Sequence, residues 1–233
     1  MTYNLTAAVI SLFDKKTLQH AAGYMGEEEK LISKAVSVIL PVVLGQLSDK
    51  ALTNDGALTV IRLIEDQKKN VLIEDVNIFF DADKGGWLNR GAKLINNVFG
   101  KNSDNLITQV AGFSGLKSSS VITLFSIAIP ATISMMAKYT DGIFLTPESI
   151  RYILVSQQNK ICATIPESFN VNKYLNWLWY PQGNDPDILE TDDELSSKEQ
   201  KIISLILRIF KWVIGISAIG IILILLWRNF IKH

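Results

Sequence analysis

Two short motifs have the residue types that metal or phosphate chemistry needs, and both fail on spacing. The stretch DADKGG, from Asp81, opens like a calcium-binding loop, but the position that should hold a bidentate Glu is Ala92. We predict a solvent-facing turn there. The pair Gly100-Lys101 has no glycine five residues before it, so it is no phosphate-binding loop. The sequence therefore predicts no metal site and no cofactor.

The sequence also has few of the residues that nucleophilic catalysis needs. The chain has only two histidines, His20 and His233, and a single cysteine, Cys162, with no histidine near it in sequence. One cysteine excludes a disulfide framework and a cysteine metal cluster. We expect a buried, inert thiol and a protein that is not an enzyme.

The charges are balanced over the whole chain and unevenly distributed along it. The 233 residues include 23 Lys and Arg and 23 Asp and Glu, and 48% of them are hydrophobic, which allows a folded core. By segment the net charge is +1 for residues 1–180, −6 for 181–197 and +5 for 198–233. This balance argues against nucleic acid as a general partner.

Residues 212–227 have the pattern of a membrane span. All sixteen are uncharged and ten are Val, Ile or Leu, with tryptophan at both ends and basic residues outside them. A buried core helix is the alternative, but it seldom has such flanks. We predict a membrane anchor whose ends are formed by Lys211, Trp212, Trp227 and Arg228. Residues 198–211, with a basic stripe on an apolar helix, should form an amphipathic helix at the lipid surface.

Two patterns predict the side of the membrane on which the domain lies. The first sixteen residues have no basic leader before their apolar run, so a signal peptide is not expected. Four basic residues precede the span and two follow it, which by the positive-inside rule gives the same orientation. We expect a single-pass, tail-anchored protein of the inner (cytoplasmic) membrane, with the N-terminal domain in the cytoplasm.

The body of the chain repeats itself at an offset of 89 residues. Residues 18–70 align without a gap on residues 107–159, and nine of the 53 positions are identical. The identities fall on glycines, on a proline within an apolar stretch and on one apolar face. They are Ala22/Ala111, Gly23/Gly112, Gly26/Gly115, Ser37/Ser126, Pro41/Pro130, Ile61/Ile150, Arg62/Arg151, Ile64/Ile153 and Asn70/Asn159.

Each repeat is predicted to have a short helix, a turn at its Gly pair and a long apolar helix kinked by the proline. The long helices should run from Glu27 to Ala51 and from Ser118 to Tyr139. Residues 121–137 have no charge, but their polar content favours a core helix over a membrane span. Residues 71–105 should add an amphipathic packing helix.

The charged residues of the repeats have structural interpretations. Glu27, Glu28 and Glu29 should begin a helix, where acidic side chains complement its dipole. Arg62 and Arg151, which are equivalent in the repeat, are expected to have a structural role, either pairing with carboxylates or forming matched sockets, and ligand binding is the alternative.

Several of these residues are similar to a known family. Gly115-Leu116-Lys117-Ser118 before a Pro-containing apolar helix, and SQQNKICATIP from Ser156 to Pro166, resemble the bacterial YidB-like family, domain of unknown function 937. The resemblance covers about residues 10–170 and implies an all-helical fold in a bacterial, often envelope-associated protein. Some relatives add a Trp-flanked membrane helix and then an OmpA-like module; in this chain we expect the helix and not the module. The family implies no activity and no functional residues.

Between the domain and the predicted span lie four aromatic residues and an acidic run. The aromatics either close the apolar end of the domain, as composition favours, or bind a partner, as Trp and Tyr do at interfaces. This candidate partner-binding set is Tyr174, Trp177, Trp179 and Tyr180. The acids should keep a solvated linker extended.

The sequence thus predicts an all-α protein with a duplicated helical unit, Pro-kinked core helices and a C-terminal transmembrane helix. Its expected segments are a helical domain (1–170), a linker (171–197), a basic helix (198–211), the span (212–227) and a tail (228–233). The predicted function is a non-enzymatic, membrane-tethered interaction or scaffold protein. Its partners would be the lipid bilayer and a protein, a second copy of the chain included. The alternatives are a ligand binder or enzyme with a pocket between the repeats, and a DNA-binding helical domain.

Overall fold

The computed structural model describes residues 4–69, 75–80, 86–171 and 174–175, and every regular element in them is helical. The prediction of an all-helical domain is confirmed. The predicted span, basic helix and acidic linker lie outside the described residues.

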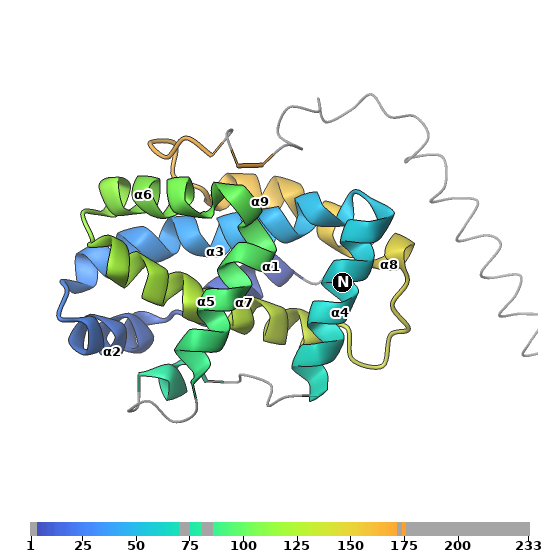
Figure 1. Cartoon of the computed structure of the whole chain (residues 1–233), viewed down its shortest axis with the longest axis horizontal. Helices are drawn as coiled ribbons and strands as arrows, with labels where there is room; N and C mark the ends of the chain where they lie inside the picture. The colour runs from blue at the N-terminus through green and yellow to red at the C-terminus, as the bar shows by residue number, and fades with distance from the viewer. Residues whose placement is uncertain (1–3, 70–74, 81–85, 172–173, 176–233) are drawn as a thin grey trace, which may run out of the picture. The chain divides into compact units, whose positions relative to one another are not determined.

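Nine α-helices and two short 3-10 helices, drawn in Figure 1, make up the described part of the chain. Their bounds are α1 Leu5–Ser11, α2 Lys15–Met25, α3 Glu29–Ala51, α4 Asn54–Lys69, η1 Val76–Phe79, α5 Trp87–Phe99, η2 Gly100–Asn102, α6 Ser103–Ser114, α7 Ser118–Tyr139, α8 Pro147–Val155 and α9 Gln158–Thr164.

The two long apolar helices α3 and α7 form the centre of the domain. They pack against each other, and the other α-helices pack against one or both of them. Both are long and apolar enough to cross a membrane, yet 72% of the apolar window of α3 and 83% of that of α7 are buried inside the domain. Such burial is typical of core helices, as expected for residues 121–137.

The boundary between α2 and α3 differs from the sequence prediction. Helix α3 begins at Glu29 rather than Glu27, because Glu28 has the extended backbone of an N-cap. Only Glu29 therefore lies in the first turn, where it complements the helix dipole. The carboxylate of Glu27 instead accepts a hydrogen bond from the Ser120 hydroxyl, at 2.7 Å, at the start of α7.

The expected turn at a Gly pair is wrong for one glycine of each pair. Gly26 and Gly115 have positive φ, 63° and 86°, and end α2 and α6. Gly23 and Gly112 lie inside those helices. A helix needs a single left-handed residue to end, so the second glycine is enough.

Helix α5 confirms the packing helix that was predicted between the repeats. It crosses in front of α7 (Figure 1) and packs against it. Its inner side buries Ile95, Val98 and Phe99, and the Phe99 ring meets Phe125 of α7 edge-on, with ring centroids 5.4 Å apart. The approach is closest at Gly91, where a Cβ would overlap the carbonyl oxygen of Ser126.

One polar atom in α7 is buried without compensation. The hydroxyl of Thr132 is fully buried and has no hydrogen-bond partner within the described part of the chain. Two positions earlier, Pro130 interrupts the hydrogen bonding of the same helix. A buried hydroxyl without a partner costs about 1–3 kcal/mol.

Replacing Thr132 with valine should therefore raise the free energy of unfolding by about 1 kcal/mol, because valine keeps the shape and removes the hydroxyl. Denaturant unfolding would measure the change. The matched control is Thr140→Val, which removes an equally buried hydroxyl that donates to the Met136 carbonyl at 2.9 Å and should lower stability. A loss of stability in Thr132→Val would contradict the assignment.

Candidate functional site

The most exposed large apolar side chain in the described part of the chain is Phe144, in the loop between α7 and α8 (residues 140–146). It is 88% exposed, and its neighbour Ile143 is 46% exposed. Tyr152, on the following helix, is 63% exposed. Neighbouring exposed apolar side chains offer a surface to a partner, and Ile143 and Phe144 are adjacent in the chain, so we take this loop as the candidate site.

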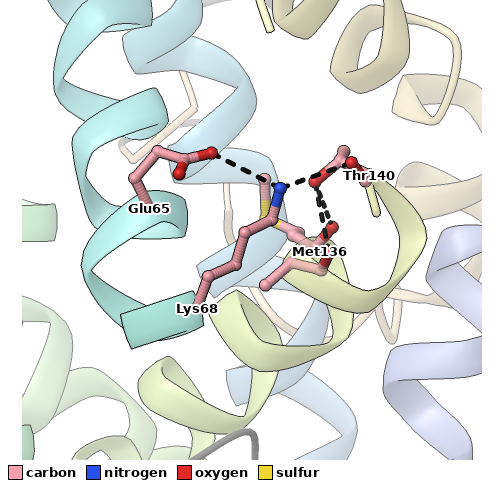
Figure 2. Close-up of polar contacts among 5 residues, drawn as sticks. Glu65, Lys68, Met136 and Thr140 are labelled. Atoms are coloured by element: carbon pink, nitrogen blue, oxygen red, sulfur yellow. Dashed lines mark hydrogen bonds and ion pairs between the residues drawn. The ribbon is translucent and has the colours of Figure 1, made fainter. Parts of the chain in front are cut away.

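The start of this loop is fixed to α4. The Lys68 ammonium lies 3.4 Å from the carbonyl oxygen of Thr140, at the end of α7, and 3.4 Å from a carboxylate oxygen of Glu65 (Figure 2). The Thr140 hydroxyl in turn donates to the Met136 carbonyl. A cation at the C-terminal end of a helix complements its dipole, so Lys68 stabilises the end of α7 from a neighbouring helix.

The chain then turns sharply into the loop. Gly142 has a φ of 72°, which favours glycine, and the Ile143 amide donates to the Thr140 carbonyl. These two features place Ile143 and Phe144 directly after a fixed turn.

The end of the loop is fixed by the start of α8. Thr146 and Ser149 form a reciprocal capping box, with Pro147 at the first position of the helix. Leu145, which is partly buried, packs against the core and occupies the position before the N-cap, where an apolar side chain can contact the first turns of the helix. Phe144 is thus held between two anchored ends and directed away from the core.

Helix α8 is tied to the turn between α3 and α4. The Arg151 guanidinium donates to the Ala51 carbonyl at 3.1 Å and to the Asn54 side chain at 2.7 Å. Its partners are thus a carbonyl and an amide. Hydrogen bonds from the Glu148 backbone and from the Thr146 side chain lower the pKa of Glu148, and the charge of Arg151 adds a smaller lowering. The expected structural role holds for Arg151, although neither partner is a carboxylate.

The SQQN motif also has a structural role. Gln157 and Gln158 are both buried. The Gln157 side-chain oxygen accepts from the amide and hydroxyl of Thr6 at 3.4 Å, and Gln158 donates to the Ser48 hydroxyl at 3.2 Å. The motif therefore joins α9 to α1 and α3.

A polar hollow of about 400 Å³ lies beside α2 and η1, outside both predicted repeats. Asp14 caps α2 by accepting from the Thr17 amide, and Thr17 hydrogen bonds hold the pKa of Asp14 low. Asp75 caps η1 by accepting from the Asn77 amide, and His20 Nδ1 lies 3.2 Å from the Asn77 side-chain oxygen. Asp14 and Asp75 thus each cap a helix.

The described residues bring together no group of three His, Cys, Asp or Glu side chains that could hold a metal ion. Cys162 is partly buried, and burial raises the pKa of its thiol, which disfavours the reactive thiolate.

Tyr174 is the one member of the predicted aromatic set that the structure describes. It is 2% exposed, burial raises the pKa of its phenol, and its hydroxyl donates to the Asn105 side chain at 2.9 Å. The next residue, Leu175, packs onto Gly45 of α3. Tyr174 therefore closes the domain. Trp177, Trp179 and Tyr180 lie outside the described residues, as do Lys211, Trp212, Trp227 and Arg228.

Sequence reasoning missed Phe144. The only signal was an apolar run, Ile143 to Leu145, between a glycine and a Thr-Pro helix start. That pattern does not separate Leu145, which packs inward, from Phe144, which points outward.

A family model described as "Bacterial protein of unknown function (DUF937)" matches residues 8–139, from α1 to the end of α7. The α7–α8 loop and the SQQN motif lie beyond the match. No curated protein and no solved structure matches the chain.

Proposed function

Because the chain belongs to the DUF937 family of bacterial proteins, whose description names no activity, we propose its function from its structure and sequence. It is a non-enzymatic interaction module, tethered to the inner membrane, that recruits or positions a protein partner. The observation that carries this proposal is the display of Phe144, together with Ile143, on a loop with both ends anchored.

The distribution of polar side chains supports a binding role over a catalytic one. Arg151, Gln157 and Gln158 each join distant parts of the fold, and Asp14 and Asp75 cap helices. A catalytic centre would instead need titratable groups directed at a common point in a cleft.

The membrane tether is proposed from the sequence of residues 198–233. Ten aliphatic side chains between Trp212 and Trp227 would contribute about −3 to −6 kcal/mol to insertion. The basic excess before Trp212 supports a cytoplasmic position for the domain.

We also propose that the domain arose by duplication of a helical unit. In support, α3 and α7 begin at Glu29 and Ser118, which are equivalent at the offset of 89. Gly26 and Gly115 end the preceding helices with the same left-handed backbone, and Pro41 and Pro130 both lie inside the long helices. The second copy has diverged at its end, where α8 has 9 residues and α4 has 16.

A photo-crosslinking amino acid in place of Phe144, in the full chain in native membranes, should capture a defined protein partner after irradiation. The same amino acid at Gln19, an exposed polar position on α2, is the control and should capture none. In addition, Phe144→Ser should reduce co-purification of that partner at least tenfold with unchanged thermal unfolding, since a mostly exposed side chain contributes little to stability. Equal capture from both positions would refute the loop as the binding site.

A further inference from the structure

Two Asp-Gly pairs occur in the chain, and the fold places them in different surroundings. They are Asp55-Gly56, in the first turn of α4, and Asp141-Gly142, in the turn before Ile143 and Phe144. An aspartate side chain reacts most readily with its own backbone when glycine follows it, because glycine has no Cβ to block the approach to its amide nitrogen. The two pairs share this chemistry and differ in their hydrogen bonds.

The Asp55-Gly56 pair is held by hydrogen bonds on both sides. The Gly56 amide donates to the Thr53 hydroxyl at 3.1 Å, and the Ala57 amide donates to the Thr53 carbonyl at 2.8 Å. The Asp55 carbonyl accepts from the Thr59 hydroxyl at 2.8 Å. The backbone of this pair therefore moves only if the first turn of α4 opens.

The reacting groups of the Asp141-Gly142 pair are not held in this way. Both residues are exposed, and neither the Asp141 carboxylate nor the Gly142 amide has a hydrogen bond within the residues that the structure describes. The backbone bonds lie at the edges of the pair. The Asp141 amide donates to the Lys138 carbonyl at 3.3 Å, and the Ile143 amide donates to the Thr140 carbonyl at 3.2 Å. The nitrogen and the carboxyl group that would react are thus both available.

We propose that Asp141 converts to isoaspartate in the folded protein, whereas Asp55 does not. The Gly142 nitrogen forms a bond to the side-chain carboxyl carbon of Asp141 in its acid form, and the carboxyl hydroxyl leaves as water with the amide hydrogen. Water then adds to the main-chain carbonyl carbon of residue 141 in this cyclic imide and breaks its bond to the nitrogen. The main chain now runs through the Asp141 side chain, and the former main-chain carbonyl becomes a free carboxylate. Water is the only other reactant, and one molecule is released and one consumed.

The product alters the turn that sets the direction of Phe144. The Cβ of Asp141 becomes a backbone atom, so the ring that the Ile143–Thr140 hydrogen bond closes gains one atom. The Thr140 carbonyl is held from α4 by the Lys68 ammonium at 3.4 Å (Figure 2). The added atom therefore displaces the Ile143 amide from that carbonyl, and Phe144 with it. This inference concerns the chain alone and does not depend on the proposed partner or on the membrane tether.

The test incubates the folded full chain in phosphatidylcholine nanodiscs at growth temperature over a time course and then digests it with trypsin. The tryptic peptide 139–151 contains Asp141, and the peptide 51–62 contains Asp55. Protein isoaspartyl methyltransferase, which methylates isoaspartate but not aspartate, measures the product in each peptide. Isoaspartate should accumulate at least tenfold faster at Asp141 than at Asp55, since a helix turn opens less often than an exposed loop. Asp141→Ser, which has no carboxyl group at this position, should give no product in peptide 139–151.

The same incubation in concentrated urea is the matched control. The unfolded chain has neither the helix turn nor the loop, so the two pairs should react at similar rates. Absence of isoaspartate at Asp141, equal accumulation at both positions in the folded chain, or a preference for Asp141 that persists in urea would each overturn the proposal. Hydrogen exchange of the Ile143 amide should be faster in the aged chain than in Asp141→Ser aged beside it. Equal exchange in the two would overturn the effect on the turn.

Discussion

Replacing Gly91 with alanine is expected to lower the free energy of unfolding by about 3 kcal/mol. The added Cβ would overlap the Ser126 carbonyl oxygen and lie 2.6 Å from the carbonyl carbon. These are backbone atoms of the central helix α7, so no side-chain rotation can relieve the overlap. The helix α5 would have to move away from α7 and give up part of the packing around Phe99 and Phe125.

The proline in α7 affects the carbonyl group that Gly91 contacts. Pro130 has no amide hydrogen, so the Ser126 carbonyl, four residues earlier, loses its donor within the helix. At Gly91 the hydrogen that stands in place of a Cβ points at this oxygen, which is the geometry of a weak Cα–H···O contact. Alanine would remove that contact as well as introduce the overlap.

Denaturant unfolding of Gly91→Ala beside Gly23→Ala would check this expectation. Gly23 lies inside α2, and a Cβ there would meet no atom within 4 Å, so alanine should raise stability by about 0.5–1 kcal/mol. The same substitution should thus have opposite effects at the two positions. A loss at Gly91 no larger than 1 kcal/mol would mean that the two helices are not closely packed there.

Ending the chain at Ser196 is expected to move the protein from the membrane fraction to the soluble fraction. The removed residues include the proposed span, and the core described for residues 4–175 stays in the shortened chain. Loss of an insertion term of about −3 to −6 kcal/mol lowers the membrane-bound fraction by a factor of 10² or more.

Fractionation with a carbonate wash would measure the distribution, and the full chain is the control. Thermal unfolding of the soluble product should show one cooperative transition, because the core of the domain is intact. If the shortened chain still pellets after the wash, the prediction that residues 212–227 form the membrane anchor is wrong. Helix α7 would then be the segment to examine, since it is the more apolar of the two membrane-length helices.

The bounds of a helix were predictable where the residues at its own ends determine them. The bounds of α7, Ser118 to Tyr139, agree with the sequence prediction, because an apolar pattern begins after a glycine and ends with polar residues. The start of α3 was less certain, since three consecutive glutamates all favour a first turn and only the extended backbone of Glu28 separates them.

The candidate sites were less predictable, because exposure depends on packing between distant segments. Tyr174 and Phe144 are both aromatic residues in loops, yet one lies against α6 and the other points outward. The glycine at position 91 was recognised only as part of an amphipathic pattern, since its contact with Ser126 comes from a helix 35 positions away in sequence.

The bonds between Thr6 and Gln157 join residues 151 positions apart, which has a consequence for synthesis. A ribosome adds about 5–20 residues per second, so α1 exists for roughly 8 to 30 s before its partner is made. Until α7, α8 and α9 are made, the parts of the apolar surface of α3 that these helices cover have no native cover. The nascent chain therefore offers a long apolar helix to whatever binds such segments first. We expect it to depend on a holding chaperone until Gln157 and α9 emerge and close the fold.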